Sequence, residues 1–147
     1  MSTPPPEVPD PASDVPDNVL VYRLVPISAC QIIAGNWEFT SSAFDNATPE
    51  HPDESPDDMS VVLGDTLAAY VRDPADLPNF NPWAGDEWGV AVLEAEFLRG
   101  DEGQELRRTP SDEEPAHGDV RGSKGSGRRK RLKKHAEWIV RPATPPD

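Results

Sequence analysis

Short runs of apolar residues alternate with proline, glycine and acidic residues along this chain. Runs rich in β-branched and aromatic residues predict strands at residues 18–26, 59–63, 89–95 and 136–141. A weaker alternation of apolar and polar positions predicts strands at 37–44, 104–109 and 116–121. Helical segments are predicted at 28–33, 66–72, 96–101 and 128–134. Short helices between strands indicate an α+β fold, a single small domain with a mostly antiparallel mixed sheet.

Details of these segments carry further expectations. Ser28 and Asp65 are suited to cap the first two helical segments, and Gly35 is suited to end the first. The apolar triplet Trp138, Ile139 and Val140 predicts a buried strand that belongs to the core, although it lies beside a basic stretch.

The ends of the chain differ in composition from its middle. Residues 1–17 are rich in proline and contain acids but no bases, which predicts a disordered tail that folding does not need. Residues 18–142 hold the apolar material of one domain, and residues 143–147 form a second short tail. Proline and acidic residues predict irregular loops at 45–58 and 77–87.

Charge is distributed very unevenly along the sequence. The first 106 residues carry 3 basic side chains against 21 acidic ones, although the whole chain has a net charge of −13. In contrast, residues 121–135 contain eight Lys or Arg and no carboxylate. Such asymmetry indicates either contact with a polyanion or contact between the acidic and basic parts of the chain.

The basic stretch is the strongest candidate for a contact surface. We expect residues 121–135 to meet an acidic protein surface or a nucleic acid, or to pack against the chain's own acidic half. The expected contact residues are Arg128, Arg129, Lys130, Arg131, Lys133 and Lys134. The acidic half offers a different reading, in which the protein mimics a nucleic acid and acts as a decoy.

Candidate catalytic and metal-binding groups are few. The three histidines lie in separate segments without a cysteine partner, so the sequence predicts no metal site and no bound cofactor. His117, between Pro115 and Gly118, is a candidate for acid–base or binding work. Cys30 has no cationic neighbour in sequence and reads as a small core residue rather than a reactive thiol.

The expected cellular compartment follows from three features that are absent from this sequence. A single cysteine allows no disulfide within the chain, and the first residues lack a secretory signal pattern. No apolar stretch approaches the length of a membrane helix. We therefore expect a cytoplasmic protein that does not contact membranes.

The chain contains Arg23, the stretch Glu38-Phe-Thr-Ser-Ser42 and the segment Glu94-Ala-Glu96. Together they resemble the signature of the Arg-Ser-Glu class of mono-ADP-ribosyltransferases, although that family has Ser-Thr-Ser where this chain has Thr-Ser-Ser. The resemblance implies an NAD pocket shaped by Arg23 and Ser41, with Glu96 stabilising a cationic sugar.

A second resemblance covers about residues 18–142. Ser41-Ser-Ala-Phe44, Met59-Ser-Val61, Gly89-Val-Ala91 and Glu114-Pro-Ala-His-Gly118 are similar to the pattern of a family of small bacterial proteins of unknown function. This resemblance implies a shared fold and no activity. The sequence as a whole favours a small intracellular interaction module over an enzyme, with NAD-dependent ADP-ribosyl transfer and nucleic-acid mimicry as alternatives.

Overall fold

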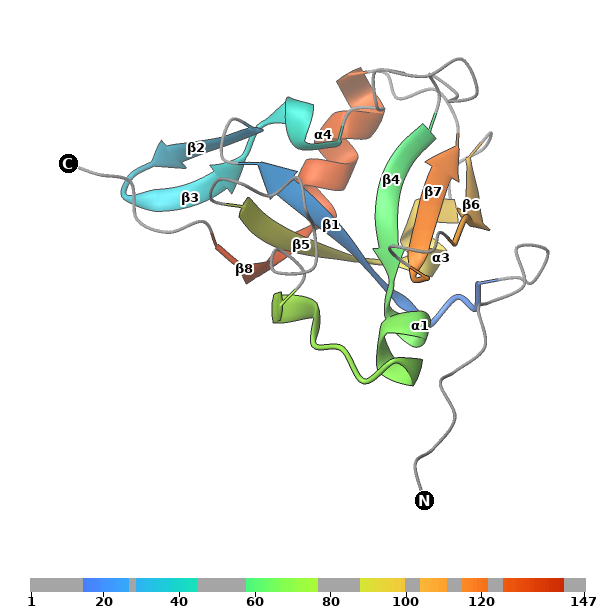
Figure 1. Cartoon of the computed structure of the whole chain (residues 1–147). Coiled ribbons are helices and arrows are strands. Elements are labelled where there is room, and N and C mark those ends of the chain that lie inside the picture. Colours follow the sequence, from blue (N-terminus) through green and yellow to red (C-terminus); the bar gives the residue numbers. More distant parts are fainter. Residues whose placement is uncertain are drawn as a thin grey trace, which may run out of the picture.

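A computed structural model of the chain describes residues 15–26, 29–44, 58–76, 88–99, 104–110, 115–121 and 126–141 (Figure 1). Within these ranges the protein has the predicted α+β fold, with one six-stranded sheet and one separate hairpin. All strand pairs between described residues are antiparallel. The fold predicted from the sequence is therefore confirmed.

The six-stranded sheet has the strand order β6–β7–β4–β1–β5–β8. Its strands are β1 (Leu20–Pro26), β4 (Asp58–Leu63), β5 (Trp88–Glu94), β6 (Glu105–Arg108), β7 (His117–Arg121) and β8 (Glu137–Val140). The hairpin consists of β2 (Cys30–Ile33) and β3 (Asn36–Phe39). The helices are α1 (Gly64–Ala69), α3 (Ala95–Arg99), α4 (Ser126–His135) and the 3₁₀ helices η2 (Ser41–Phe44) and η3 (Pro74–Asp76).

The central strand β1 pairs very differently with its two neighbours. It pairs with β5 along its whole length, from Leu20 opposite Glu94 to Pro26 opposite Trp88. It pairs with β4 only at Val21 and Tyr22, and the two strands then diverge (Figure 1). At the closed end, a Cβ atom on Gly64 would lie 2.6 Å from the carbonyl oxygen of Leu20. Glycine is therefore required where β4 runs into α1.

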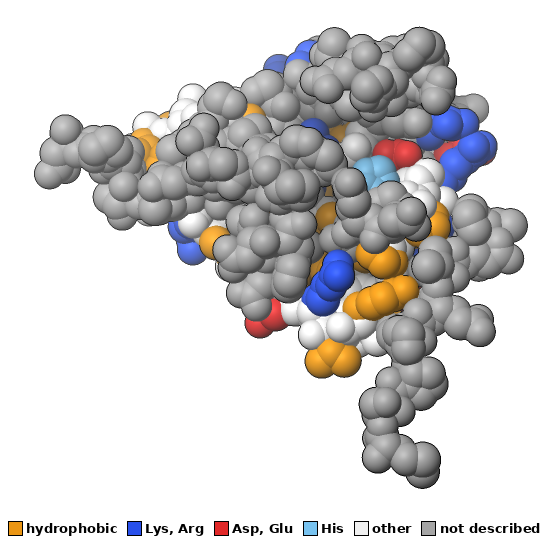
Figure 2. All heavy atoms as spheres, viewed as in Figure 1, with side chains coloured by type: hydrophobic (Ala, Val, Ile, Leu, Met, Phe, Trp, Pro, Cys, Tyr) orange, Lys and Arg blue, Asp and Glu red, His pale blue; other side chains and the backbone are white. Residues whose placement is uncertain are grey.

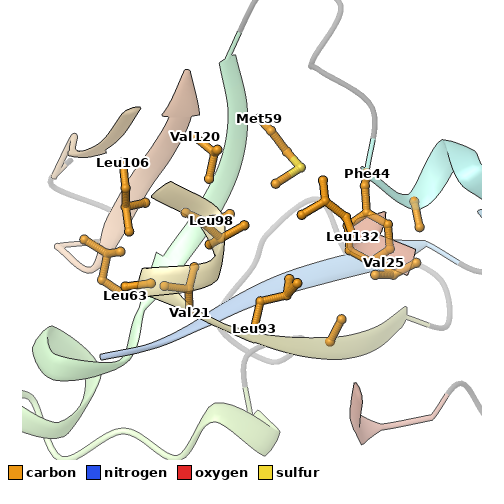
Figure 3. Packing of buried hydrophobic residues seen from close by; sticks show 14 of the residues in the cluster. Val21, Val25, Phe44, Met59, Leu63, Leu93, Leu98, Leu106, Val120 and Leu132 are labelled. Atoms are coloured by element: carbon orange, nitrogen blue, oxygen red, sulfur yellow. The ribbon is translucent and has the colours of Figure 1, made fainter. Parts of the chain in front are cut away.

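The main core fills the space between the diverging strands and the helices on one face of the sheet. Phe44 of η2 and Leu132 of α4 lie beside Val25, while Leu98 of α3 lies beside Val21 (Figure 3). Alternate residues of β1 point to the other face, where Tyr22 packs in a second cluster with Val62, Leu67, Val90 and Ala116. Both faces of the central strand are thus packed.

One ion pair lies close to this core. Arg108 of β6 is 8 % exposed and donates to both carboxylate oxygens of Asp65, at 3.0 and 2.6 Å. The hydrogen bond from Arg108, ahead of all other causes, holds the pKa of the Asp65 carboxyl below its ordinary value. The pair fastens the start of α1 to an edge strand.

Residues 30–33 form the strand β2 and not the helical turn that the sequence predicts for residues 28–33. Ala34 and Gly35 both have positive φ angles, of 52° and 82°, and form the two-residue turn between β2 and β3. Such a turn matches the twist of paired strands, so residues 30–33 become a strand. Ser28 lies outside the described residues, and Gly35 turns a hairpin instead of ending a helix.

Two further segments differ from the prediction. The expected strand 37–44 ends at Phe39, because η2 follows and turns Phe44 into the core. The helix expected to extend to Arg72 stops at Ala69, and Val71 adopts a positive φ of 54°. Asp65 is not the N-cap, but its carboxylate accepts a hydrogen bond from the backbone N–H of Thr66 at 2.7 Å.

The triplet in β8 is buried only in part. Val140 is paired with Val90 and Trp138 with Ala91, so Ile139 is an extra residue in the ladder. This bulge turns Trp138 and Val140 towards different core clusters and leaves Ile139 43 % exposed. The prediction that all three residues are buried is therefore wrong for Ile139.

The expected start of the domain at residue 18 is three residues too late. Val15 is 1 % exposed and belongs to the main core. Arg99 of α3 donates to the carbonyl oxygen of Val15 and pairs with the carboxylate of Asp17. Residues 1–14 and 142–147 lie outside the described residues, as do most of the loops expected at 45–58 and 77–87.

The described surface mixes apolar and charged groups. On the face seen in Figure 2, hydrophobic side chains lie beside separate basic groups, and the described acidic groups do not form one continuous patch. Among the described residues, no helix is both long enough and apolar enough to cross a membrane.

We expect Asp65→Asn to destabilise the protein by about 2–3 kcal/mol at about pH 7, because the buried Arg108 would lose its counter-charge. The control is Glu105→Gln, which breaks the exposed Arg107–Glu105 pair and should cost less than about 1 kcal/mol. The folded-state pKa of Asp65 is lowered, so its contribution is present above the unfolded pKa and is lost as pH falls through the folded pKa. Urea denaturation should therefore show a smaller difference between wild type and Asp65→Asn at about pH 3. Equal costs for the two variants at neutral pH would contradict the pairing.

A chain that begins at Asn18 should unfold about 8 °C below the full-length protein, because it lacks the buried Val15 side chain and both partners of Arg99. A chain that begins at Ser13 keeps these groups and should stay within about 2 °C of full length. Calorimetry on the three chains measures the difference. Identical midpoints would show that Val15 adds nothing to the core.

Candidate functional site

A groove lies between α4, the strand β3 and the end of β8. Its volume is about 630 Å³. Three lysines of α4 and Arg141 contribute its positive charge, and one carboxylate, Glu38, also lines it. The full lining is Asn36, Trp37, Glu38, Phe39, Lys130, Lys133, Lys134, Ala136, Trp138 and Arg141.

The helical repeat of α4 explains which basic residues reach the groove. Lys130, Lys133 and Lys134 are three and four positions apart and therefore share one side of the helix. Leu132 is 3 % exposed and points the opposite side of the helix into the main core. Burial of this one leucine thus fixes the rotation of α4 and turns three lysines towards β3.

The basic stretch is consequently divided by the fold. Arg128 and Arg129 are half-buried on the side of α4 that holds Leu132. Arg131 is exposed to solvent but does not line the groove. Of the six contact residues expected from the sequence, only Lys130, Lys133 and Lys134 line the groove. Within the part of the chain that the structure describes, no ion pair joins these three lysines to a carboxylate.

The basic residues at the end of α4 are also placed favourably with respect to the helix dipole. Lys133, Lys134 and His135 occupy the last turn of α4. Cations there interact favourably with the negative end of the helix dipole. Lys130 and Lys134 are four positions apart and repel one another, and a bound anion would relieve this repulsion.

Aromatic residues form the opposite wall. The ring of Trp138 stacks on the buried Phe39 ring, with centroids 4.0 Å apart and planes inclined by 25°. The Trp138 indole N–H donates to the carbonyl oxygen of Trp37 at 3.2 Å. These contacts hold the aromatic wall of the groove in place and attach the hairpin to the main sheet.

The hairpin also presents apolar side chains to solvent. Trp37 is half-buried and lies directly opposite Ile32 in the β2–β3 pair. Ile32 is 45 % exposed and Ile33 is 52 % exposed. Cross-strand partners share a face of the hairpin, so Ile32 extends the apolar wall begun by Trp37.

The three residues of the ADP-ribosyltransferase resemblance do not gather at one place. Arg23 donates from Nε to the carbonyl oxygen of Ala43 and from Nη1 to that of Ser60, both at 2.6 Å. Ser41 begins the same short helix η2 that contains Ala43. Glu96, however, follows the end of β5 that pairs with Leu20, at least three strand residues or about 10 Å from Arg23.

Arg23 instead connects main-chain groups. The hydrogen bonds to Ala43 and Ser60 join β1 to η2 and to the diverging strand β4. The described geometry does not assemble Arg23, Ser41 and Glu96 into the NAD site that the resemblance implies.

His117 lies on β7, away from the groove. Its Nδ1 atom is 2.7 Å from the Thr109 hydroxyl oxygen, and the Thr109 backbone N–H donates to the carbonyl oxygen of His117 at 3.0 Å. The pair links β7 to the segment after β6. Among the described residues, no group of three or more potential metal ligands occurs.

Several groove residues could not be found from the basic stretch alone. Trp37, Glu38 and Arg141 come from different segments and meet the lysines only through tertiary packing. The only local signal for the hairpin is Gly35, and it is weak, because the favoured two-residue turns have Asn, Asp or Gly before the glycine and this chain has Ala34.

Comparisons with known proteins do not extend this description. No protein-family model matches the chain, and no match was found among curated proteins or solved structures.

Cys30 should react slowly with thiol reagents. It is half-buried beside the main core, and burial raises the pKa of its thiol to about 11. At about pH 8 the thiolate fraction falls roughly a hundredfold, partly offset by greater nucleophilicity, so we expect a rate about tenfold below that of the urea-unfolded chain. A chromogenic disulfide reagent measures both rates. Equal rates would show that Cys30 is accessible and ionised normally.

Proposed function

We propose that this protein is an interaction module that binds anionic groups of a partner in the groove between α4, β3 and β8. The convergence of Lys130, Lys133, Lys134 and Arg141 on one concave surface is the observation that carries the proposal. Four cations against a single lining carboxylate make this surface positive although the chain has a net charge of −13.

The architecture of the groove supports binding better than catalysis. Its aromatic wall is held by the Phe39–Trp138 stack and the Trp138–Trp37 hydrogen bond, and α4 is held by the burial of Leu132. Because both sides of the groove are held in place before a ligand arrives, binding does not require the backbone to become ordered, and the entropy cost of binding is lower.

Binding should depend on the groove lysines and not on positive charge in general. The test variant changes Lys130, Lys133 and Lys134 to Gln. The matched control changes Arg72, Arg107 and Arg131 to Gln, which removes the same charge outside the groove. Both variants should fold, because none of the six side chains is buried and charges at the protein surface contribute little to stability.

Fluorescence anisotropy with labelled poly-glutamate and a labelled oligothymidylate provides the measurement. If four cations meet phosphates of a single strand, log K should fall with log salt with a slope of about −3. The lysine variant should lose two to three orders of magnitude in affinity at about 50 mM salt, and the arginine control should keep wild-type affinity within about threefold. Absence of binding to both probes, or equal losses in the two variants, would overturn the proposal.

A further inference from the structure

The groove combines its cations with features that a simple phosphate site does not need. Glu38 lines the groove together with the four cations, and the exposed Ile32, next to the lining, is the cross-strand partner of Trp37. We propose, on the basis of the anion-binding function above, that the occupant is a short acidic peptide segment of a partner protein, with apolar side chains between its carboxylates.

Glu38 argues against a continuous polyanion. A nucleic acid carries a negative charge at every nucleotide, so one of its phosphates would lie near this carboxylate and be repelled. A peptide has N–H groups along its backbone and can place a neutral or basic residue at this point. The single carboxylate in the lining therefore selects against uniform negative charge.

The apolar wall points to the same kind of ligand. Nucleic-acid sites stack bases on aromatic rings or on Arg planes. Here one side of the Trp138 ring is covered by Phe39, and the exposed residue paired with Trp37 across the hairpin is Ile32, a branched aliphatic side chain. Methyl groups of isoleucine offer no flat surface for a base, but they pack well against Val or Leu side chains of a peptide.

Spacing permits both contacts at once. Lys130 and Lys134 are one helical turn apart, which is about 6 Å along the axis of α4. Alternate side chains of an extended peptide are about 7 Å apart and point to one side, while the residues between them point to the other. An acidic–apolar alternation would place its carboxylates towards α4 and its apolar groups towards the hairpin.

The net charge of the protein also limits how acidic the ligand can be. At −13 the protein repels anions, and this repulsion grows with every ligand charge that lies outside the groove. A segment with two to four carboxylates places all of them within reach of the groove cations. A long polyanion leaves most of its charge outside.

The test compares three labelled probes of similar length on the full chain by anisotropy. The first peptide alternates Glu and Val with one central Lys, the second replaces each Val with Ser, and the third probe is oligothymidylate. We expect the Glu/Val peptide to bind at least fivefold more tightly than each of the others. All three should lose affinity when Lys130, Lys133 and Lys134 are changed to Gln.

Two single variants separate the apolar wall from the carboxylate. Ile32→Ser should weaken binding of the Glu/Val peptide about fivefold and leave oligothymidylate unchanged. Ile139→Ser is its control, because Ile139 has nearly the same exposure, 43 % against 45 %, but lies on β8, whereas Ile32 is paired with the groove residue Trp37. Glu38→Gln should raise the affinity for oligothymidylate severalfold and reduce the preference for the peptide.

The outcomes distinguish this inference from the function on which it rests. If no probe binds, the anion-binding function itself fails. If oligothymidylate binds as tightly as the Glu/Val peptide and Ile32→Ser changes neither, the groove is an anion site and the peptide inference is overturned. Self-association of the free protein that disappears in the lysine variant would identify a second copy as the occupant, and would also overturn it.

Discussion

The close approach of β1 and β4 at Gly64 is the constraint on which the rest of the architecture depends. A side chain at position 64, directly after β4, would collide with the Leu20 carbonyl oxygen, so the chain can pass this close to β1 only because glycine stands there. The two strands pair over two residues and then separate (Figure 1). The opening would expose apolar faces of both strands if nothing filled it. Phe44 and Leu132 occupy this space (Figure 3). Arg23 of β1 donates a hydrogen bond to the Ser60 carbonyl oxygen of β4 across it.

The groove is a consequence of that filling. Leu132 can enter the opening only if α4 turns the opposite side of its helix outward, and that side carries the lysines. The bulge at Ile139 then brings Trp138 onto Phe39, which closes the other wall. Core packing and the placement of charge are therefore coupled: a change that rotates α4 would move the cations as well as the core leucine.

Local sequence signals predicted most strands and the helix α4 because their side chains decide their structure within a few residues. Val19 to Val25 and Val90 to Leu93 are dense in β-branched residues that suit a buried strand. The failures occur where a distant contact or an unusual dihedral angle decides. Ala34 enters a positive φ that alanine rarely adopts, and this converts an expected helical turn into a hairpin.

Most of the candidate site could not be predicted from the sequence, because packing between distant segments brings its residues together. Lys130, Lys133 and Lys134 stood out as members of a basic stretch, but nothing local separated them from Arg128 and Arg129. That separation follows from the burial of Leu132 between Phe44 and the sheet. Glu38 belongs to the segment that resembles ADP-ribosyltransferases, but in the fold it lines the groove with the lysines because the β2–β3 hairpin places it there.

A basic groove on an acidic protein is physically consistent because electrostatic range is short in salt. At physiological ionic strength the screening length is about 8 Å, so an anion in the groove responds mainly to charges within that distance. The groove lining is positive on this scale, whereas the acidic excess of the whole chain acts only on the approach of a ligand. The net charge should therefore slow association and disfavour long polyanions, while the affinity for a short ligand is set by the groove. The uneven distribution of charge should therefore favour short anionic ligands over long ones as well as anions over cations in the groove.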